Sequence, residues 1–205
     1  YDYYTLVKLL LPSFNVNKKI EMSDNLLKKF DQFRWSKKTV EKPILVFAIE
    51  KGNVDIVKLI LSSPQVDFNI KVVEKTNWYR INDDAKSLNE NWIVEKTMLQ
   101  VAFENKTKNF QLIETLLSAT SININDTITI QMNTNDEIVK TKKTILHLAV
   151  EEGNLKILRL LLSHPKINVN SKYLVTENDS TILKNITALQ IAVDTENIEI
   201  CKLLI

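Results

Sequence analysis

The chain has 205 residues, of which 44% are hydrophobic and 25% are charged, a composition typical of a folded domain or a compact repeat array. Its formal net charge of +2 is too small to favour a nucleic-acid or membrane-surface partner. No apolar run approaches the roughly 18 residues that suggest a membrane span.

The first 42 residues predict two helical segments. The run Leu6–Leu11 has the apolar spacing of the helices described below, so residues 1–17 are interpreted as a partial repeat unit. Residues 18–42 carry eight Lys or Arg against four acidic residues. Their large apolar side chains have helical spacing and follow a possible cap at Ser23 or Asp24, which predicts an amphipathic helix. These side chains are Leu26, Leu27, Phe30 and Phe33.

A helix-pair pattern then occurs four times, in residues 43–70, 97–125, 144–170 and 187–205. The first segment of each unit has an alanine that lets a neighbouring helix approach closely, and three of the four begin at a threonine suited to an N-cap. The alanines are Ala48, Ala102, Ala149 and Ala192, and the threonines are Thr97, Thr144 and Thr187. An asparagine N-cap precedes a second segment with apolar residues at positions 1, 3, 4, 7 and 8, one wide face of a helix. These asparagines are Asn53, Asn109, Asn154 and Asn197.

The third unit carries a family resemblance. Its segment Thr144-Ile145-Leu146-His147-Leu148-Ala149 is similar to the T-P-L-H-x-A signature of ankyrin repeats, and the closing turn at 167–170 continues the match. The chain therefore resembles the ankyrin repeat family, which implies an all-α solenoid of helix pairs. One departure is the spacing of the four alanines, which is 54, 47 and 43 residues instead of about 33. The second unit also has two extra residues near Lys106 and Thr107.

The excess length lies in connecting segments, or fingers, at residues 18–42, 71–96, 126–143 and 171–186. Three of these fingers read as strand, polar turn, strand, which predicts β-hairpins. The longest of the three begins at Val72-Val73, turns near Asp83-Asp84 and returns at Trp92–Val94. We expect one domain spanning residues 1–205, cut from a longer protein because the chain starts without Met and ends in an apolar run.

The longest hairpin contains candidate contact residues. Insertions between repeats often form the binding face, and Trp, Tyr and Arg are enriched among interface hot spots. The candidates are Trp78, Tyr79, Arg80 and Trp92. The alternative is that these aromatic residues pack the hairpin onto the helices.

A row of acidic residues forms a second candidate site. One carboxylate occupies the same slot near the end of the first helix of each unit: Glu50, Glu104, Glu151 and Asp194. We expect the row to face the concave side, where it could steer a basic partner. The alternative is that these residues only solvate that face.

The remaining candidates favour structural roles. The basic finger at 18–42 suits an acidic peptide or phosphates, or simply a solvated helix face. His147 stands at the family's capping and packing histidine, His164 lies in a turn, and Cys201 takes a slot filled elsewhere by core residues. No catalytic constellation, metal-ligand set or cofactor motif is recognisable.

The resemblance implies a protein–protein interaction module, an adaptor or scaffold, that binds a partner through finger tips and the concave first-helix face. We expect an intracellular protein that is not an enzyme and needs no cofactor, nucleic acid, membrane or small-molecule substrate. The alternative is a regulatory or spacer array within a larger enzyme or membrane protein. The sequence does not name the partner.

Overall fold

The computed structural model describes residues 15–23, 28–31, 34–81, 87–105, 110–119, 121–134, 137–178 and 181–205. Several predicted features lie outside this part of the chain, among them the apolar run of the partial unit, the hairpin tip at 83–84 and the two extra residues near 106–107.

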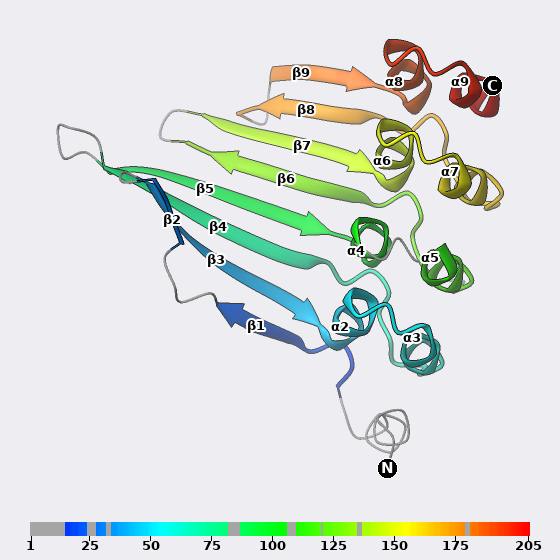
Figure 1. Cartoon of the computed structure of the whole chain (residues 1–205), viewed down its shortest axis with the longest axis horizontal. Coiled ribbons are helices and arrows are strands. Elements are labelled where there is room, and N and C mark those ends of the chain that lie inside the picture. The colour runs from blue at the N-terminus through cyan, green and yellow to red at the C-terminus, as the bar shows by residue number, and fades with distance from the viewer. Residues whose placement is uncertain are drawn as a thin grey trace.

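In the described part of the chain, four helix pairs stack side by side (Figure 1). Their bounds are α2 (Ile44–Glu50) and α3 (Val54–Leu61), α4 (Met98–Glu104) and α5 (Phe110–Leu117), α6 (Ile145–Glu151) and α7 (Leu155–Leu162), and α8 (Ala188–Asp194) and α9 (Ile198–Leu204). The first helix of each pair lies next to the sheet and the second helix lies beyond it. The predicted solenoid of helix pairs is therefore confirmed.

The predicted caps explain where most of these helices begin. Asn53, Asn154 and Asn197 each accept a hydrogen bond from the backbone N–H three residues later. Thr97 and Thr187 form reciprocal capping boxes with a glutamine three residues later. Asn109 lies outside the described residues.

The hydrophobic core lies between neighbouring helix pairs. The repeated alanines Ala102, Ala149 and Ala192 are fully buried, which lets adjacent first helices approach closely. The second helices of the first three units each bury the fourth residue completely: Val57, Ile113 and Leu158. Cys201 occupies this slot in the last unit and is only half-buried. The prediction that it is a buried core residue is therefore wrong, because it lies at the edge of the core.

Asparagines also join consecutive units, a role that the sequence analysis did not foresee. The Asn125 amide donates to the carbonyl oxygen of Lys166 at 2.7 Å and accepts from the N–H of Asn168 at 2.8 Å. Asn17 makes the same pair of bonds to the loop after α3, and Asn69 to the loop after α5. Each bridge fixes one closing turn to the next.

The fingers form one antiparallel sheet. Its order is β1-β3-β4-β5-β6-β7-β8-β9, with β2 also paired to β3. The strands are β1 (Lys19–Ser23), β2 (Lys28–Asp31), β3 (Arg34–Pro43), β4 (Val72–Ile81), β5 (Ser87–Lys96), β6 (Thr127–Asn133), β7 (Ile138–Thr144), β8 (Tyr173–Glu177) and β9 (Thr181–Ile186). The three predicted hairpins are confirmed. They also pair with one another, so the fingers make a continuous surface that extends away from the helices (Figure 1).

The prediction of a helix in residues 18–42 is wrong, because β1, β2 and β3 occupy this finger. Strand β3 pairs with β4 from Arg34↔Arg80 to Glu41↔Val73. This ladder satisfies the backbone along nearly the whole strand and overrides the helical spacing of a few apolar residues. Of those residues, Leu26, Leu27 and Phe33 lie outside the described part of the chain.

Candidate functional site

The sheet has two distinct faces. Residues directly opposite each other on antiparallel strands point to the same face, and successive residues alternate between faces. We call the face that carries Lys42, Lys96 and Lys143 the inner face, because these lysines reach the first helices. The opposite face is called the outer face.

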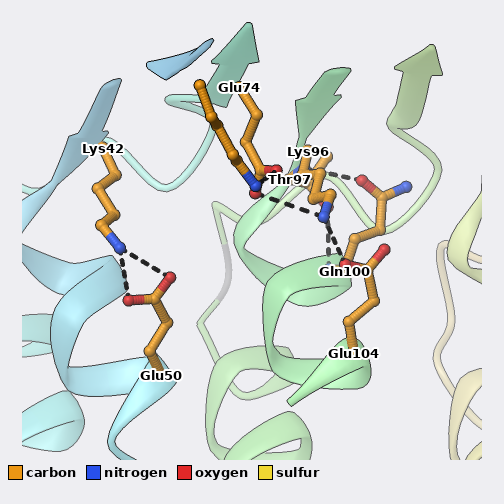
Figure 2. Close-up of polar contacts among 8 residues, drawn as sticks. Lys42, Glu50, Glu74, Lys96, Thr97, Gln100 and Glu104 are labelled. Atoms are coloured by element: carbon orange, nitrogen blue, oxygen red, sulfur yellow. Dashed lines mark hydrogen bonds and ion pairs between the residues drawn. The ribbon is translucent and has the colours of Figure 1, made fainter. Parts of the chain in front are cut away.

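Each of these three lysines makes an ion pair with the glutamate eight residues later, at the end of the following helix. The Lys42 Nζ contacts both carboxylate oxygens of Glu50, at 2.9 and 2.7 Å. Lys96 pairs with Glu104 at 2.7 Å, as Figure 2 shows. The third pair, described below, has the same length. We call these contacts the strand–helix clips, because each joins the strand that enters a helix to that helix's last turn.

The second clip extends into a network across two strands. Glu74 on β4 accepts from Lys38 at 2.7 Å and lies 3.5 Å from Lys96 (Figure 2). Burial alone would raise the pKa of Glu74, but the two lysines outweigh it and lower that pKa. Burial would likewise lower the pKa of Lys96, but Glu104 and Glu74 raise it. The network therefore stays charged at neutral pH.

The structure places the predicted acidic row along the helix edge of the inner face. Three of its four members are held in clips; Lys143 and Glu151 make the third pair, at 2.7 Å. In the fourth unit an isoleucine stands eight residues before Asp194, and no described residue forms an ion pair with this aspartate. The row is thus largely neutralised within the molecule, and its role in steering a basic partner stays a prediction.

The predicted aromatic cluster lies on the hairpin β4–β5. Trp92 is 38% exposed on the inner face and pairs with Met132 of the next hairpin. Trp78 pairs with Ser36 and Glu90, six residues along β4 from the helix end of the strand. At this distance along the strand the backbone of Trp78 is far from the helices. This argues against the alternative that Trp78 packs the hairpin onto them. The side chains of residues 78–80 lie outside the described structure, so their contact role stays a prediction.

A set of apolar residues on the inner face was missed by the sequence reasoning. These half-buried side chains lie beside Trp92 on four neighbouring strands: Val94, Ile130, Met132, Val139 and Val175. The β6–β7 hairpin alternates apolar and polar residues, which was the available signal. Alternation marks one face as apolar, but the register between hairpins decides that these faces align.

His147 has the predicted capping and packing role. It is fully buried, its Nδ1 accepts the N–H of Thr144 at 3.1 Å, and its Nε2 lies 3.1 Å from the carbonyl oxygen of Ser171. Nε2 therefore donates, and the ring is neutral. Burial, the largest influence, lowers the pKa of His147. These contacts use both ring nitrogens, which leaves neither for chemistry.

The described residues contain no group of three or more His, Cys, Asp or Glu side chains that could hold a metal ion. Within that same part of the chain, no helix is long and apolar enough to cross a membrane. In the basic finger, Lys38 and Lys42 are engaged with Glu74 and Glu50. Binding of an acidic peptide or phosphates by this finger stays a prediction.

A family model for ankyrin repeats, three copies in length, matches residues 1–173 and, in a second match, residues 128–205. Comparisons with curated proteins and with solved structures find no match. Ankyrin repeats in general are protein-interaction modules. The helix pairs, the hairpin fingers and the family match across the chain agree: this protein belongs to the ankyrin repeat family.

Proposed function

We propose that this array is an adaptor or scaffold that binds a partner protein through its finger tips and the concave surface formed by the inner face and the first helices. The observation that supports this proposal is the continuous sheet, whose strands run directly into the first helices. The clips and asparagine bridges hold this surface in one arrangement. A surface ordered before binding loses little conformational entropy when a partner docks.

The alternative is a regulatory or spacer array that belongs to a larger enzyme or membrane protein and makes no partner contact of its own. The two proposals differ in what the isolated surface does. An adaptor binds its partner without the rest of the protein, whereas a spacer does not.

Affinity capture from cell lysate tests the proposal. Hairpin β4–β5 pairs with β3 on one side and β6 on the other, so deleting it would break the sheet. The variant therefore keeps the hairpin and replaces residues 78–80, near its tip, with alanines. Its control replaces the exposed Lys58 and Glu114 on the second helices with alanine.

We expect a protein that binds the unaltered bait and the second-helix control but is lost from the tip variant. Circular dichroism confirms that all three baits are folded. If the unaltered bait is folded but captures no protein, the adaptor proposal fails and the spacer interpretation replaces it. Equal capture by tip variant and control would contradict the role of the tips.

A further inference from the structure

The two edge strands of the sheet differ in how they are protected against further pairing. In Figure 1, β1 lies at the lower edge and β9 at the upper edge, and no strand in the described part of the chain pairs beyond either of them. An edge strand directs the backbone N–H and C=O groups of alternate residues away from its partner. Each edge therefore offers these groups to an extended segment, unless the strand carries a feature that blocks pairing.

The β9 edge carries two such features. Val175 pairs with Lys184 and Thr176 with Ile182, so β9 has a bulge at this point. The same register places the charged Lys184 on the inner face of the edge strand. Bulges and inward-pointing charges are two devices by which natural sheets prevent edge-to-edge pairing.

The β1 edge has neither feature. All five residues of β1 pair with β3 without a register shift. The inner-face residues of β1 are Ile20 and Met22, and each keeps 42% of its surface exposed. They stand opposite Lys42, which Glu50 holds in the first clip, and the half-buried Val40. A regular edge with exposed apolar side chains on one face favours the addition of a strand.

The charges on the outer face of β1 indicate which strand would fit. Glu21 stands directly opposite Glu41 of β3, and like charges in this position are unfavourable. Glu41 has Lys75 at 3.5 Å, but Glu21 and Lys19 make no ion pair with any described residue. Lys18, directly before the strand, adds a second cation beside Lys19. An added strand is therefore complementary when a cation lies opposite Glu21 and a carboxylate lies opposite Lys19.

We propose that β1 binds an extended segment of the partner protein as an added antiparallel strand. The inference rests on the proposed function, because it names the element of the partner that the array recognises. Separate hairpins already join in this way, by antiparallel pairing of β5 with β6 and of β7 with β8. From its N-terminus, the segment has a polar residue, an apolar residue, Lys or Arg, an apolar residue, and Asp or Glu. These lie opposite Ser23, Met22, Glu21, Ile20 and Lys19 in turn.

The experiment titrates the whole chain into two short labelled peptides and follows fluorescence anisotropy. The first peptide has the central sequence Thr-Val-Lys-Val-Glu and the second has Thr-Val-Glu-Val-Lys, so their composition and net charge are the same. A swap variant of the protein combines Lys19→Glu and Glu21→Lys. The matched control combines Lys58→Glu and Glu114→Lys, which exchanges two exposed charges on the second helices.

We expect the first peptide to bind at least about fivefold more tightly than the second, because two cross-strand pairs change from opposite to like charges. The swap variant should reverse this preference. The second-helix control should keep the dissociation constant of each peptide within about twofold. Thermal unfolding of both variants verifies that the fold is kept.

Methylation of the peptide backbone separates strand pairing from simple charge attraction. The N–H groups of alternate residues point to opposite edges of a strand. Two methylated forms of the first peptide are therefore compared, each lacking one alternate set of N–H groups. The form methylated on the edge that faces β1 should lose binding, and the other form should bind within about twofold of the unmodified peptide.

Four results would overturn the proposal: no binding of the first peptide, equal binding of both peptides, an unchanged preference in the swap variant, or equal effects of the two methylations. The competing occupant is a second copy of this chain. A dimer in sedimentation equilibrium that Ile20→Lys dissociates would put that copy in place of the partner's strand.

Failure here is distinct from failure of the adaptor function. If lysate capture yields a partner that the swap variant still binds fully, the array is an adaptor that uses another surface. If capture yields none, the adaptor function itself fails.

Discussion

The third and fourth helix pairs have nearly the same sequence pattern but very different burial. Leu146 is 1% exposed, whereas Leu189 at the same slot of the fourth pair is half-buried. Val150 is 2% exposed, whereas the equivalent Val193 is 59% exposed. The third pair packs against described helices on both sides and the fourth on one side. The repeat pattern thus sets the helices, and the neighbouring units set how much each helix buries.

The two pairs also differ in their polar features. Gly153, between the helices of the third pair, has a φ of +66°, and Glu196 occupies the equivalent position in the fourth pair at +55°. Glycine adopts this left-handed conformation without steric cost, whereas a glutamate does not. The third pair has the Lys143–Glu151 clip, and the fourth has none at Asp194. The fourth pair therefore rests on caps and core contacts with fewer supporting features.

The largest expected difference between the pairs comes from their leucines. Leu146→Ala leaves a cavity among fully buried neighbours and should lower the free energy of unfolding by about 3 kcal/mol. Leu189→Ala removes a half-buried side chain and should cost about half as much or less. Urea denaturation of both variants measures the difference. Equal losses would show that the fourth pair is packed as tightly as the third.

The asparagine bridge into the third unit gives a smaller effect. Asn125→Ala removes two hydrogen bonds to the loop after α7 and should lower the free energy of unfolding by about 1–2 kcal/mol. Asn170 has the same place in the closing turn of the third unit, but its side chain makes no hydrogen bond to a described residue. Asn170→Ala is therefore the matched control, with an expected change within about 0.5 kcal/mol. Similar losses for both variants would contradict the bridging role.

The stability of the two pairs should depend differently on pH. The residue that completes the cap of the first helix, three positions after the capping threonine, is His147 in the third pair and Gln190 in the fourth. The fold lowers the pKa of His147 below its usual 6.5, so below that pH the unfolded chain binds a proton that the folded chain resists. Stability should fall as the pH decreases from about 6.5 through the folded-state pKa, by at most about 1.4 kcal/mol per pH unit. His147→Gln keeps the cap and should flatten this dependence in urea melts between pH 7 and pH 5. An unchanged slope would assign the dependence to other groups.

The helix pairs were predictable because their signals are local. The asparagine cap and the apolar spacing after Asn154 lie within one helix, and tertiary packing agrees with them. The sheet was less predictable. Hairpins such as β6–β7 show local alternation, but pairing of β5 with β6 joins residues about 40 positions apart. In the first finger, the long ladder of β3 with β4 outweighed a local helical spacing.

The candidate site was predictable in its positions but not in its contacts. The acidic row follows from repeat alignment, which places Glu50, Glu104 and Glu151 in one slot. Their lysine partners stand eight residues earlier, across a strand–helix junction, and this spacing matches neither the helical nor the strand period. Comparing the three units would have revealed it, because a lysine recurs at this distance in each. The alignment of the apolar side chains on the inner face depends on the register between hairpins, which the sequence alone does not specify.

Of the four predicted changes in stability, the one from the Lys143–Glu151 clip should be the smallest. Lys143 is 17% and Glu151 30% exposed, so solvent screens part of their attraction and the pair should contribute about 0.5 kcal/mol. A double-mutant cycle with Lys143→Met and Glu151→Gln isolates this coupling from the lysine's contact with the Tyr173 ring at 5.1 Å. In the fourth pair, Asp194→Asn removes a carboxylate that has no described partner and should change stability by less than about 0.5 kcal/mol. High salt should reduce the coupling between Lys143 and Glu151, because exposed ion pairs are screened. A coupling near zero at low salt would mean that the clips set the direction of the side chains along the inner face without stabilising the fold.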